Sequence, residues 1–420
     1  MRLIKLLPAL ILSICAFSCF AQDTIQHIVQ GRSNSPEQIG KHYVILISSD
    51  GFRHDFAKKY HAKNLLEFSK KGVRAEYLQP SYPSLTFPNH YSIATGMYPS
   101  HHGIVDNTMF DKNKNAVYSL GNHKEVADSS WYGGIPIWVL AEQHKMLSAS
   151  FFWVGSETAV TGVRPTYYYN YSDKINIDTR IEAVKKWLEL PEEKRPHLIT
   201  FYFNEPDHTE HKYGPESKET EEAVKLVDES IRKLTDALAP LNLDIDYVFV
   251  SDHGMTAVDT KNTLSLPASV DTTKFRVLGG SSIIHLYARD RDDDIQAAYS
   301  KIKKEANDFD VYLAAEMPER WHYSKKEDVY DRIGDILLVP HLPKVFNLGK
   351  YPANIGNHGF DPELEDMHAT FYAWGPDFKK KMQIPGFENV NIYPLIARLL
   401  GLSYDQKIDG DLKVLMPILK

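Results

Sequence analysis

The sequence predicts an α/β fold, in which helices cover both faces of a mostly parallel central sheet. Three runs predict strands: Tyr43 to Ile47 is continuously apolar, and His197 to Phe203 and Ile245 to Val250 are rich in β-branched and aromatic residues. Such runs are typical of strands buried on both faces. Amphipathic stretches separate them, the longest from Glu216 to Leu238. Strands that alternate with helices in this way favour a parallel sheet covered on both sides.

The same alternation continues along the chain. Helices are predicted over residues 65–71, 133–144, 181–188 and 390–400, and further strands over 148–153 and 369–374. From about residue 262 to 352 the pattern loosens into short alternating strands, such as 282–287 and 335–339, among charged segments. We therefore expect a single domain over residues 41–420 that carries a smaller inserted sub-domain at about 262–352.

The first residues differ from the rest of the chain. Arg2 and Lys5 precede an apolar run from Leu6 to Phe20, and small residues lead to Ala21. This pattern predicts a secretory signal peptide over residues 1–21, and a lipid anchor on Cys19 is the alternative. The run is short for a transmembrane helix, and no later segment is apolar enough to be one. We therefore expect a secreted protein.

Composition limits the possible metal ligands and binding partners. Both cysteines, Cys15 and Cys19, lie in the predicted leader, so any metal in the mature protein must be held by His, Asp or Glu. Residues 22–40 are polar and predict a flexible lead-in. The formal net charge of −7 argues against a stable complex with nucleic acid.

The most unusual stretch runs from Pro80 to Asn107. Three prolines hold the chain extended around Thr86, and the apolar spacing predicts a short buried helix that begins just after Thr86 and ends near Gly96. Free N–H groups at a helix start favour an anion. A hydroxyl at this position is either a helix cap or a nucleophile, and this stretch alone leaves both open.

Acid and histidine side chains follow the predicted strands. There are six such groups: Asp50, Asp207, His211, Asp252, His253 and His358. Each motif alone is most simply a turn or a surface pair. Together they divide into two sets of three, as two Zn²⁺ sites with open positions require. A pair of metal ions can hold a phosphoryl oxygen and activate a hydroxyl, which is the help that Thr86 would need as a nucleophile.

Six motifs follow one another along the chain: SSDGFR at 48–53, the segment TFPNHYSIATGMYPSHHGIVDN at 86–107, GIPIWVLAEQ at 134–143, NEPDHTEHKYGP at 204–215, SDHGM at 251–255 and GNHGFDP at 356–362. They resemble those of the nucleotide pyrophosphatase/phosphodiesterase family, within the alkaline phosphatase superfamily. The resemblance runs in order from about residue 42 to 400 and is closest to the compact bacterial type. It implies an alkaline-phosphatase-like fold and a single catalytic domain.

The resemblance also implies a covalent intermediate on Thr86 and two Zn²⁺ per chain, although His and carboxylate ligands would also accept manganese or cobalt. The implied ligands are Asp50, Thr86, Asp252 and His253 for the first zinc, and Asp207, His211 and His358 for the second.

The implied substrate contacts lie around the same centre. Asn107 would donate to a phosphoryl oxygen, Phe87 and Tyr168 would stack on a nucleobase, and Tyr202 would line the same pocket. Core packing is the alternative for Phe87 and Tyr168. Leu85 stands where some relatives carry lysine, so phosphates beyond the scissile one would meet less positive charge. The neighbours that could replace Tyr168 in this role are Tyr167, Tyr169 and Tyr171.

The function implied is that of a secreted, periplasmic di-zinc phosphodiesterase and pyrophosphatase that releases nucleoside 5′-monophosphates. Its substrates would be nucleoside triphosphates, dinucleotides and nucleotide esters. One alternative is a choline- or phospholipid-type phosphodiesterase, or a phosphomonoesterase, on the same scaffold. Another is an inactive binding protein, which the presence of Thr86 and of all six acid and histidine groups argues against.

Overall fold

The computed structural model describes residues 23–290 and 294–420. The predicted signal peptide and the alternative lipid anchor at Cys19 fall outside these residues. Within the described part of the chain, none of the helices combines the length and the apolar character needed to cross a membrane.

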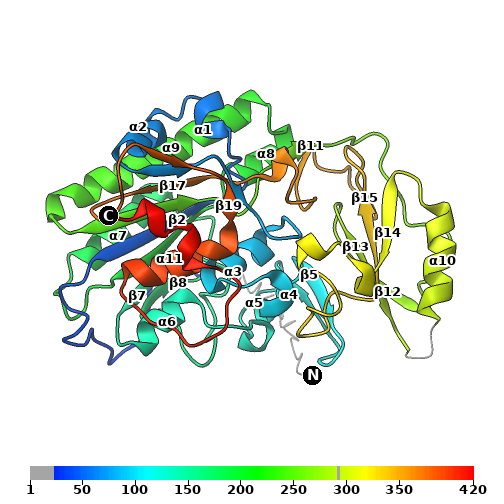
Figure 1. The fold of residues 1–420 in the computed structure, drawn as a ribbon, viewed down its shortest axis with the longest axis horizontal. Coiled ribbons are helices and arrows are strands. Elements are labelled where there is room, and N and C mark those ends of the chain that lie inside the picture. The colour runs from blue at the N-terminus through cyan, green and yellow to red at the C-terminus, as the bar shows by residue number, and fades with distance from the viewer. Residues whose placement is uncertain (1–22, 291–293) are drawn as a thin grey trace, which may run out of the picture.

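A nine-stranded sheet forms the centre of the fold, and its middle strands are parallel as predicted (Figure 1). Strands β9, β2 and β10 lie side by side in that order, and β17 pairs antiparallel with β10. In sheet order the strands are β1 (His27–Ile28), β8 (Tyr167–Tyr169), β7 (Ser148–Phe151), β9 (Leu198–Phe203), β2 (Tyr43–Ser49), β10 (Ile245–Val250), β17 (Phe371–Trp374), β3 (Val73–Ala75) and β18 (Met382–Ile384).

Strand β2 shows why these runs form a buried sheet. All of its residues are buried, with Val44 and Leu46 in one hydrophobic core and Ile45 and Ile47 in another. Because successive side chains of a strand point to opposite faces, a continuous apolar run serves a sheet that is covered on both sides.

Helices cover the two faces as predicted. On one face lie α1 (Phe56–Lys59), α2 (Lys63–Lys71), α7 (Ile177–Leu188) and α9 (Lys218–Leu238), whose apolar residues share a core with Ile45 and Ile47. On the other lie α3 (Thr86–Thr95), α6 (Ile137–Gln143) and α11 (Ile392–Leu399), beside Val44 and Leu46. Figure 1 shows the sheet between these two layers.

The region from about 262 to 352 forms a second, four-stranded sheet with its own core, drawn to one side of the main sheet in Figure 1. It consists of β12 (Phe275–Gly279), β13 (Ile284–Ala288), β15 (Ile336–Pro340) and β14 (Phe309–Leu313), with α10 (Ile295–Glu305) packed against β14. The chain leaves through β11 (Thr256–Ala257) and returns through β16 (Gly356–Asn357), which pair with each other.

The remaining described α-helices and strands are short: β4 (Leu78–Gln79), α4 (Pro99–His102), β5 (Thr108–Asp111), β6 (Ala116–Ser119), α5 (His123–Val126), α8 (Asp207–Tyr213) and β19 (Phe387–Glu388).

The lead-in that we expected to be flexible is instead held against the domain from residue 23 onward. Strand β1 pairs with β8 at the edge of the sheet. The buried Asn34 side chain donates to the carbonyls of Glu192 and Arg195 and accepts from the N–H of Leu147. These contacts could not be predicted, because the sequence does not distinguish a polar side chain that bonds to backbone groups from an exposed one.

Candidate active site

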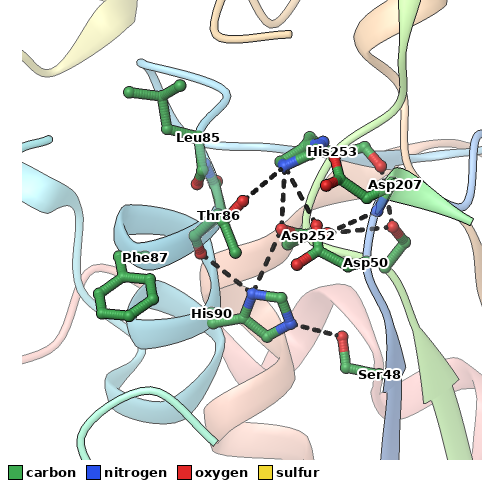
Figure 2. Close-up of polar contacts among 12 residues, drawn as sticks. Ser48, Asp50, Leu85, Thr86, Phe87, His90, Asp207, Asp252 and His253 are labelled. Atoms are coloured by element: carbon green, nitrogen blue, oxygen red, sulfur yellow. Dashed lines mark hydrogen bonds and ion pairs between the residues drawn. The ribbon is translucent and has the colours of Figure 1, made fainter. Parts of the chain in front are cut away.

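The predicted acid and histidine groups meet at the carboxyl ends of three neighbouring parallel strands. Asp50 follows β2, Asp207 begins the helix α8 that follows β9, and Asp252 and His253 follow β10 (Figure 2). Because β9, β2 and β10 are adjacent, their ends deliver these side chains to one place. This is the edge at which ligands gather in open α/β sheets.

Thr86 occupies the first position of α3, as the prolines and the apolar spacing predicted. Leu85 precedes it in an extended conformation, and Gly96 ends the helix with φ of 70°. The Thr86 hydroxyl lies 3.2 Å from Nε2 of His253 (Figure 2). Leu85, not Thr86, occupies the N-cap position of the helix, and the Thr86 hydroxyl makes its hydrogen bond with His253. The geometry thus favours a reactive hydroxyl over a helix cap.

Three histidines present the same ring nitrogen to the carboxylates. Nδ1 of His211, His253 and His358 each lies 2.9 Å from a backbone carbonyl, that of Gly356, Gly254 and Ser84 respectively. A carbonyl only accepts, so each Nδ1 donates to it, and in the neutral ring the lone pair is then on Nε2. A backbone contact of this kind fixes the ring tautomer of metal-binding histidines.

Asp50 and Asp252 each use one carboxylate oxygen as a hydrogen-bond acceptor and leave the other without a hydrogen bond. Oδ2 of Asp50 accepts from the Tyr202 hydroxyl at 2.6 Å, and Oδ1 of Asp252 accepts from the Gly51 N–H at 3.2 Å. The other oxygen of each, together with Oδ1 of Asp207, is buried and makes no hydrogen bond, and histidine ring nitrogens lie 3.0 to 3.5 Å from these oxygens. Buried carboxylates are costly unless positive charge balances them.

Burial and neighbouring charges shift the pKa values of Asp50 and His358. Burial, followed by repulsion from Asp252 and Asp207, raises the pKa of Asp50 well above its usual range. Burial, followed by the neighbouring His253 and His211, lowers the pKa of His358 well below its usual range. A neutral histidine is the form that binds metal, and a divalent cation would hold Asp50 ionised. The donor set therefore fits divalent metal ions.

The structure joins the expected ligands into one continuous cluster. Asp207, His211 and His358 form one compact group, which matches a predicted set of three. Nε2 of His253 lies 3.0 Å from Asp252 and 3.5 Å from Asp50, which connects the other set. Asp207 is also within reach of Asp50 and His253, so it lies between the two sets.

His90 also belongs to this cluster, although nothing in the sequence separated it from the histidines that we expected to be structural. It is fully buried, with Nδ1 3.2 Å from Asp252 Oδ2 and 3.0 Å from the Thr86 carbonyl. Its Nε2 lies 2.8 Å from the Ser48 hydroxyl (Figure 2). The available signal was helical phase, because His90 follows Thr86 by four residues and lies on the same face of α3.

Asn107 approaches the start of α3 from the segment before β5. Its Oδ1 accepts from the Phe87 N–H at 3.0 Å. This contact fixes the orientation of the amide, since Oδ1 is the acceptor. Its NH₂ group is then the donor available to a ligand beside Thr86.

A cavity of about 310 Å³ opens in front of Thr86. It combines the metal-binding groups with an aromatic and apolar wall and two further polar residues that we did not predict, His123 and Glu157. Burial raises the pKa of Glu157, whose carboxylate accepts from the Tyr171 N–H. The lining residues are Thr86, Phe87, Asn107, Leu120, His123, Val126, Phe152, Trp153, Val154, Gly155, Glu157, Tyr171, Tyr202, Asp207, His211 and His358.

The prediction for Tyr168 is wrong, and Tyr171 takes its place at the cavity. Tyr168 is in strand β8, where its ring stacks on that of His27 with the centroids 5.0 Å apart. It does not line the cavity. Tyr171 follows the strand and contacts the rings of Phe152 and Tyr202 at 5.1 and 6.2 Å. Strand alternation separates neighbouring tyrosines, and the sequence did not reveal where the strand ended.

The other expected substrate contacts divide into two groups. Phe87 and Tyr202 line the cavity, although the Tyr202 hydroxyl is bonded to Asp50. The Leu85 side chain points away from the carboxylates in Figure 2 and is not part of the lining.

Comparison with known proteins agrees with this geometry. The sequence model described as "Type I phosphodiesterase / nucleotide pyrophosphatase" matches residues 44–361. The chain is 34% identical over 379 residues to "Ectonucleotide pyrophosphatase/phosphodiesterase family member 3" of Bos taurus, a match covering 88% of this chain and 43% of the relative. It is 35% identical to the human family member 1 over 86% of this chain and 40% of the relative. The chain thus spans less than half the length of these curated relatives.

Solved structures show the same likeness. The murine ectonucleotide pyrophosphatase/phosphodiesterase 5 (NPP5), described as an inactive threonine-to-alanine variant in complex with AMP, matches with a TM-score of 0.84 at 28% identity, covering 90% of this chain and all of that one. The human NPP5 structure also matches with a TM-score of 0.84, at 27% identity and the same coverage. The family's sequence model matches three quarters of this chain, and the acid and histidine groups meet at the carboxyl edge of the sheet. The chain therefore belongs to the type I phosphodiesterase / nucleotide pyrophosphatase family.

Proposed function

We propose that this chain is an exported di-zinc phosphodiesterase and pyrophosphatase, which cleaves nucleotide phosphodiester and phosphoanhydride bonds and releases nucleoside 5′-monophosphates. The observation that carries the proposal is the Thr86 hydroxyl, which faces the cavity from the start of α3 beside His253 and the buried carboxylates. The names of the relatives support the substrate class. A periplasmic location is part of the proposal.

Two zinc ions would be held by the groups that the sequence indicated. Asp50, Asp252 and His253 would hold one beside Thr86, and Asp207, His211 and His358 would hold the other. When bound, such ions supply positive charge to phosphoryl oxygens and favour the ionised form of a coordinated hydroxyl.

The residues of the chain would act in two steps. The Thr86 oxygen attacks the phosphorus that carries the nucleoside, its proton leaves to solvent, and the bond to the leaving group breaks. Water then attacks the Thr86-bound phosphorus and releases the nucleoside monophosphate, which restores the hydroxyl. The Asn107 NH₂ and the free N–H groups at the start of α3 lie where they can donate to a phosphoryl oxygen. The inactive threonine-to-alanine murine relative supports a threonine nucleophile.

Hydrolysis of ATP in ¹⁸O-labelled water tests this assignment. Attack at the phosphorus that carries the nucleoside places the label in AMP and leaves the pyrophosphate unlabelled. A phosphomonoesterase on the same scaffold would instead label inorganic phosphate and yield ADP, and this result would refute the proposal.

Tyr171 is expected to stack on the nucleobase. Tyr171→Ala should lower kcat/KM for a nucleotide ester by about 5- to 150-fold, because stacking of one base on an aromatic ring contributes about 1–3 kcal/mol. Tyr168→Ala is the matched control, since this ring lies against His27 outside the cavity. Steady-state kinetics of both variants decide the matter, and an equal loss in the two would exclude a role for Tyr171 in base binding.

Asn107→Asp separates the two functions of the Asn107 amide. The new carboxylate can still accept from the Phe87 N–H but has no NH₂ to donate and adds a negative charge. We expect kcat to fall by about 10²–10³-fold, as for loss of one donor to a developing charge. Unchanged kcat with an intact melting temperature would remove Asn107 from the reaction.

One observation favours a second candidate. Glu157 lines the cavity together with Tyr171 and Trp153, and its carboxylate accepts from the Tyr171 N–H. An acidic group among aromatic rings also suits a quaternary ammonium, so a choline-bearing phosphodiester is the competing substrate.

A further inference from the structure

A second cluster of metal-ligand type lies at the other end of the parallel strands. His42 immediately precedes β2, Asp246 is the second residue of β10, and Asp377 follows β17. The catalytic groups follow the carboxyl ends of β2 and β10, whereas His42 and Asp246 lie at their amino ends. The two clusters are therefore separated by the length of the sheet.

The geometry of this cluster is compact. His42 Nδ1 lies 3.0 Å from Asp377 Oδ2 and 3.7 Å from Asp246 Oδ2. One ligand atom from each of the three residues lies within 4.8 Å of the others. One imidazole nitrogen and two carboxylate oxygens form a donor set typical of Zn²⁺ and related transition metals, and the imidazole disfavours Ca²⁺.

Asp246 supplies an independent reason to expect a cation. Its side chain is 0% exposed, Oδ1 accepts from the Asp377 N–H at 3.1 Å, and Oδ2 makes no hydrogen bond. The unpartnered oxygen is directed toward His42 and Asp377. A carboxylate buried at this position is costly unless positive charge is bound.

The backbone is shaped to bring Asp246 and Asp377 together. Gly375 has φ of 147°, and a Cβ there would lie 2.3 Å from Asp246 Oδ1. Only glycine therefore allows the turn after β17 to approach the start of β10 so closely. Three cationic residues line the adjoining cavity: Lys41 donates to the Gly401 carbonyl, Lys420 donates to the Pro376 carbonyl, and the Arg398 side chain is exposed.

We propose that His42, Asp246 and Asp377 bind a third, structural transition-metal ion of the Zn²⁺ class. Two carboxylates and a neutral imidazole balance its charge, and the adjoining cavity of about 560 Å³ gives water access to complete the coordination. The ion joins the starts of two central strands to Asp377. That residue is also bonded to the end of the chain, because its carbonyl accepts from the Lys420 N–H at 2.9 Å.

Metal content measured by mass spectrometry tests this site. Wild type, Asp246→Asn, His42→Gln and the control Asp244→Asn are equilibrated with Zn²⁺ and dialysed against a weak chelator. Asp244 is exposed and two residues from Asp246, so the control removes a nearby carboxylate without touching the cluster. We expect Asp246→Asn and His42→Gln each to hold one Zn²⁺ fewer per chain than wild type and the control.

Melting temperature gives a second readout. The rise on adding Zn²⁺ should be smaller in both cluster variants than in the control, by about 2–4 °C, because binding to the folded state alone stabilises it. Equal metal content and equal rises in all four proteins would overturn the proposal. His42 is only partly buried, so His42→Gln decides the question if Asp246→Asn fails to fold. The test compares the number of Zn²⁺ ions per chain between variants, so its result does not depend on which metal the catalytic centre holds.

Discussion

Thr86→Ala is expected to lower kcat for nucleotide esters by at least about 10³-fold while leaving metal content and nucleotide binding close to those of wild type. The physical reason is that the hydroxyl faces the cavity and makes its hydrogen bond with His253, whereas Leu85 occupies the N-cap position of α3. Its removal should therefore cost the reaction without unfolding the helix. Burst-phase and steady-state kinetics, with nucleotide binding measured by calorimetry, check both parts.

Thr95→Ala is a useful control for this experiment. Thr95 lies in the same helix, and its hydroxyl donates to the Tyr91 carbonyl away from the site. We expect this variant to keep near-normal turnover. If Thr86→Ala also retained near-normal turnover, Thr86 would be a structural residue and the two-step reaction would have to be abandoned.

Removal of divalent metal is expected to abolish turnover, and Zn²⁺ should restore it. Three buried carboxylate oxygens without hydrogen bonds and three inward-facing imidazole nitrogens would lose the cation that their arrangement requires. Chelation followed by titration with Zn²⁺, Mn²⁺ or Ca²⁺ measures this dependence. Recovery with Zn²⁺ or Mn²⁺ and not with Ca²⁺ is expected from the imidazole content.

A matched pair of variants locates the effect. His358→Ala removes a ligand of the cluster, whereas His368→Ala changes a histidine that stacks on Tyr77 outside it. We expect metal content and turnover to fall only in the first. Full activity of the chelated wild-type protein would contradict a metal-dependent reaction.

The sequence was sufficient for the fold because each central strand is dominated by apolar residues. Residues 43–47 and 245–250 predict strands buried on both faces, and the structure places them side by side in the sheet. Residues 22–40 were predicted less well. Their polar side chains bond to backbone carbonyls that only the folded chain brings near, as Asn34 does.

Some residues of the site could likewise be predicted from the sequence, and others could not. Residues directly after strands, such as Asp50 and Asp252, could be placed from the sequence because the strand ends determine their position. Tyr171 and Glu157 could not, since both lie in irregular segments whose course depends on packing against other parts of the chain. The four-residue spacing from Thr86 could have placed His90 on the same face of α3. That spacing does not distinguish a functional histidine from a buried structural one.

The most direct test of the central claim is the rate of hydrolysis of two chromogenic esters by the purified, zinc-loaded protein. These are p-nitrophenyl-thymidine-5′-monophosphate and p-nitrophenylphosphorylcholine. We predict a strong preference for the nucleotide ester, which is lost on chelation and reduced by Tyr171→Ala. A preference for the choline ester would contradict the nucleotide assignment and would show that Glu157 and the aromatic wall of the cavity bind a quaternary ammonium.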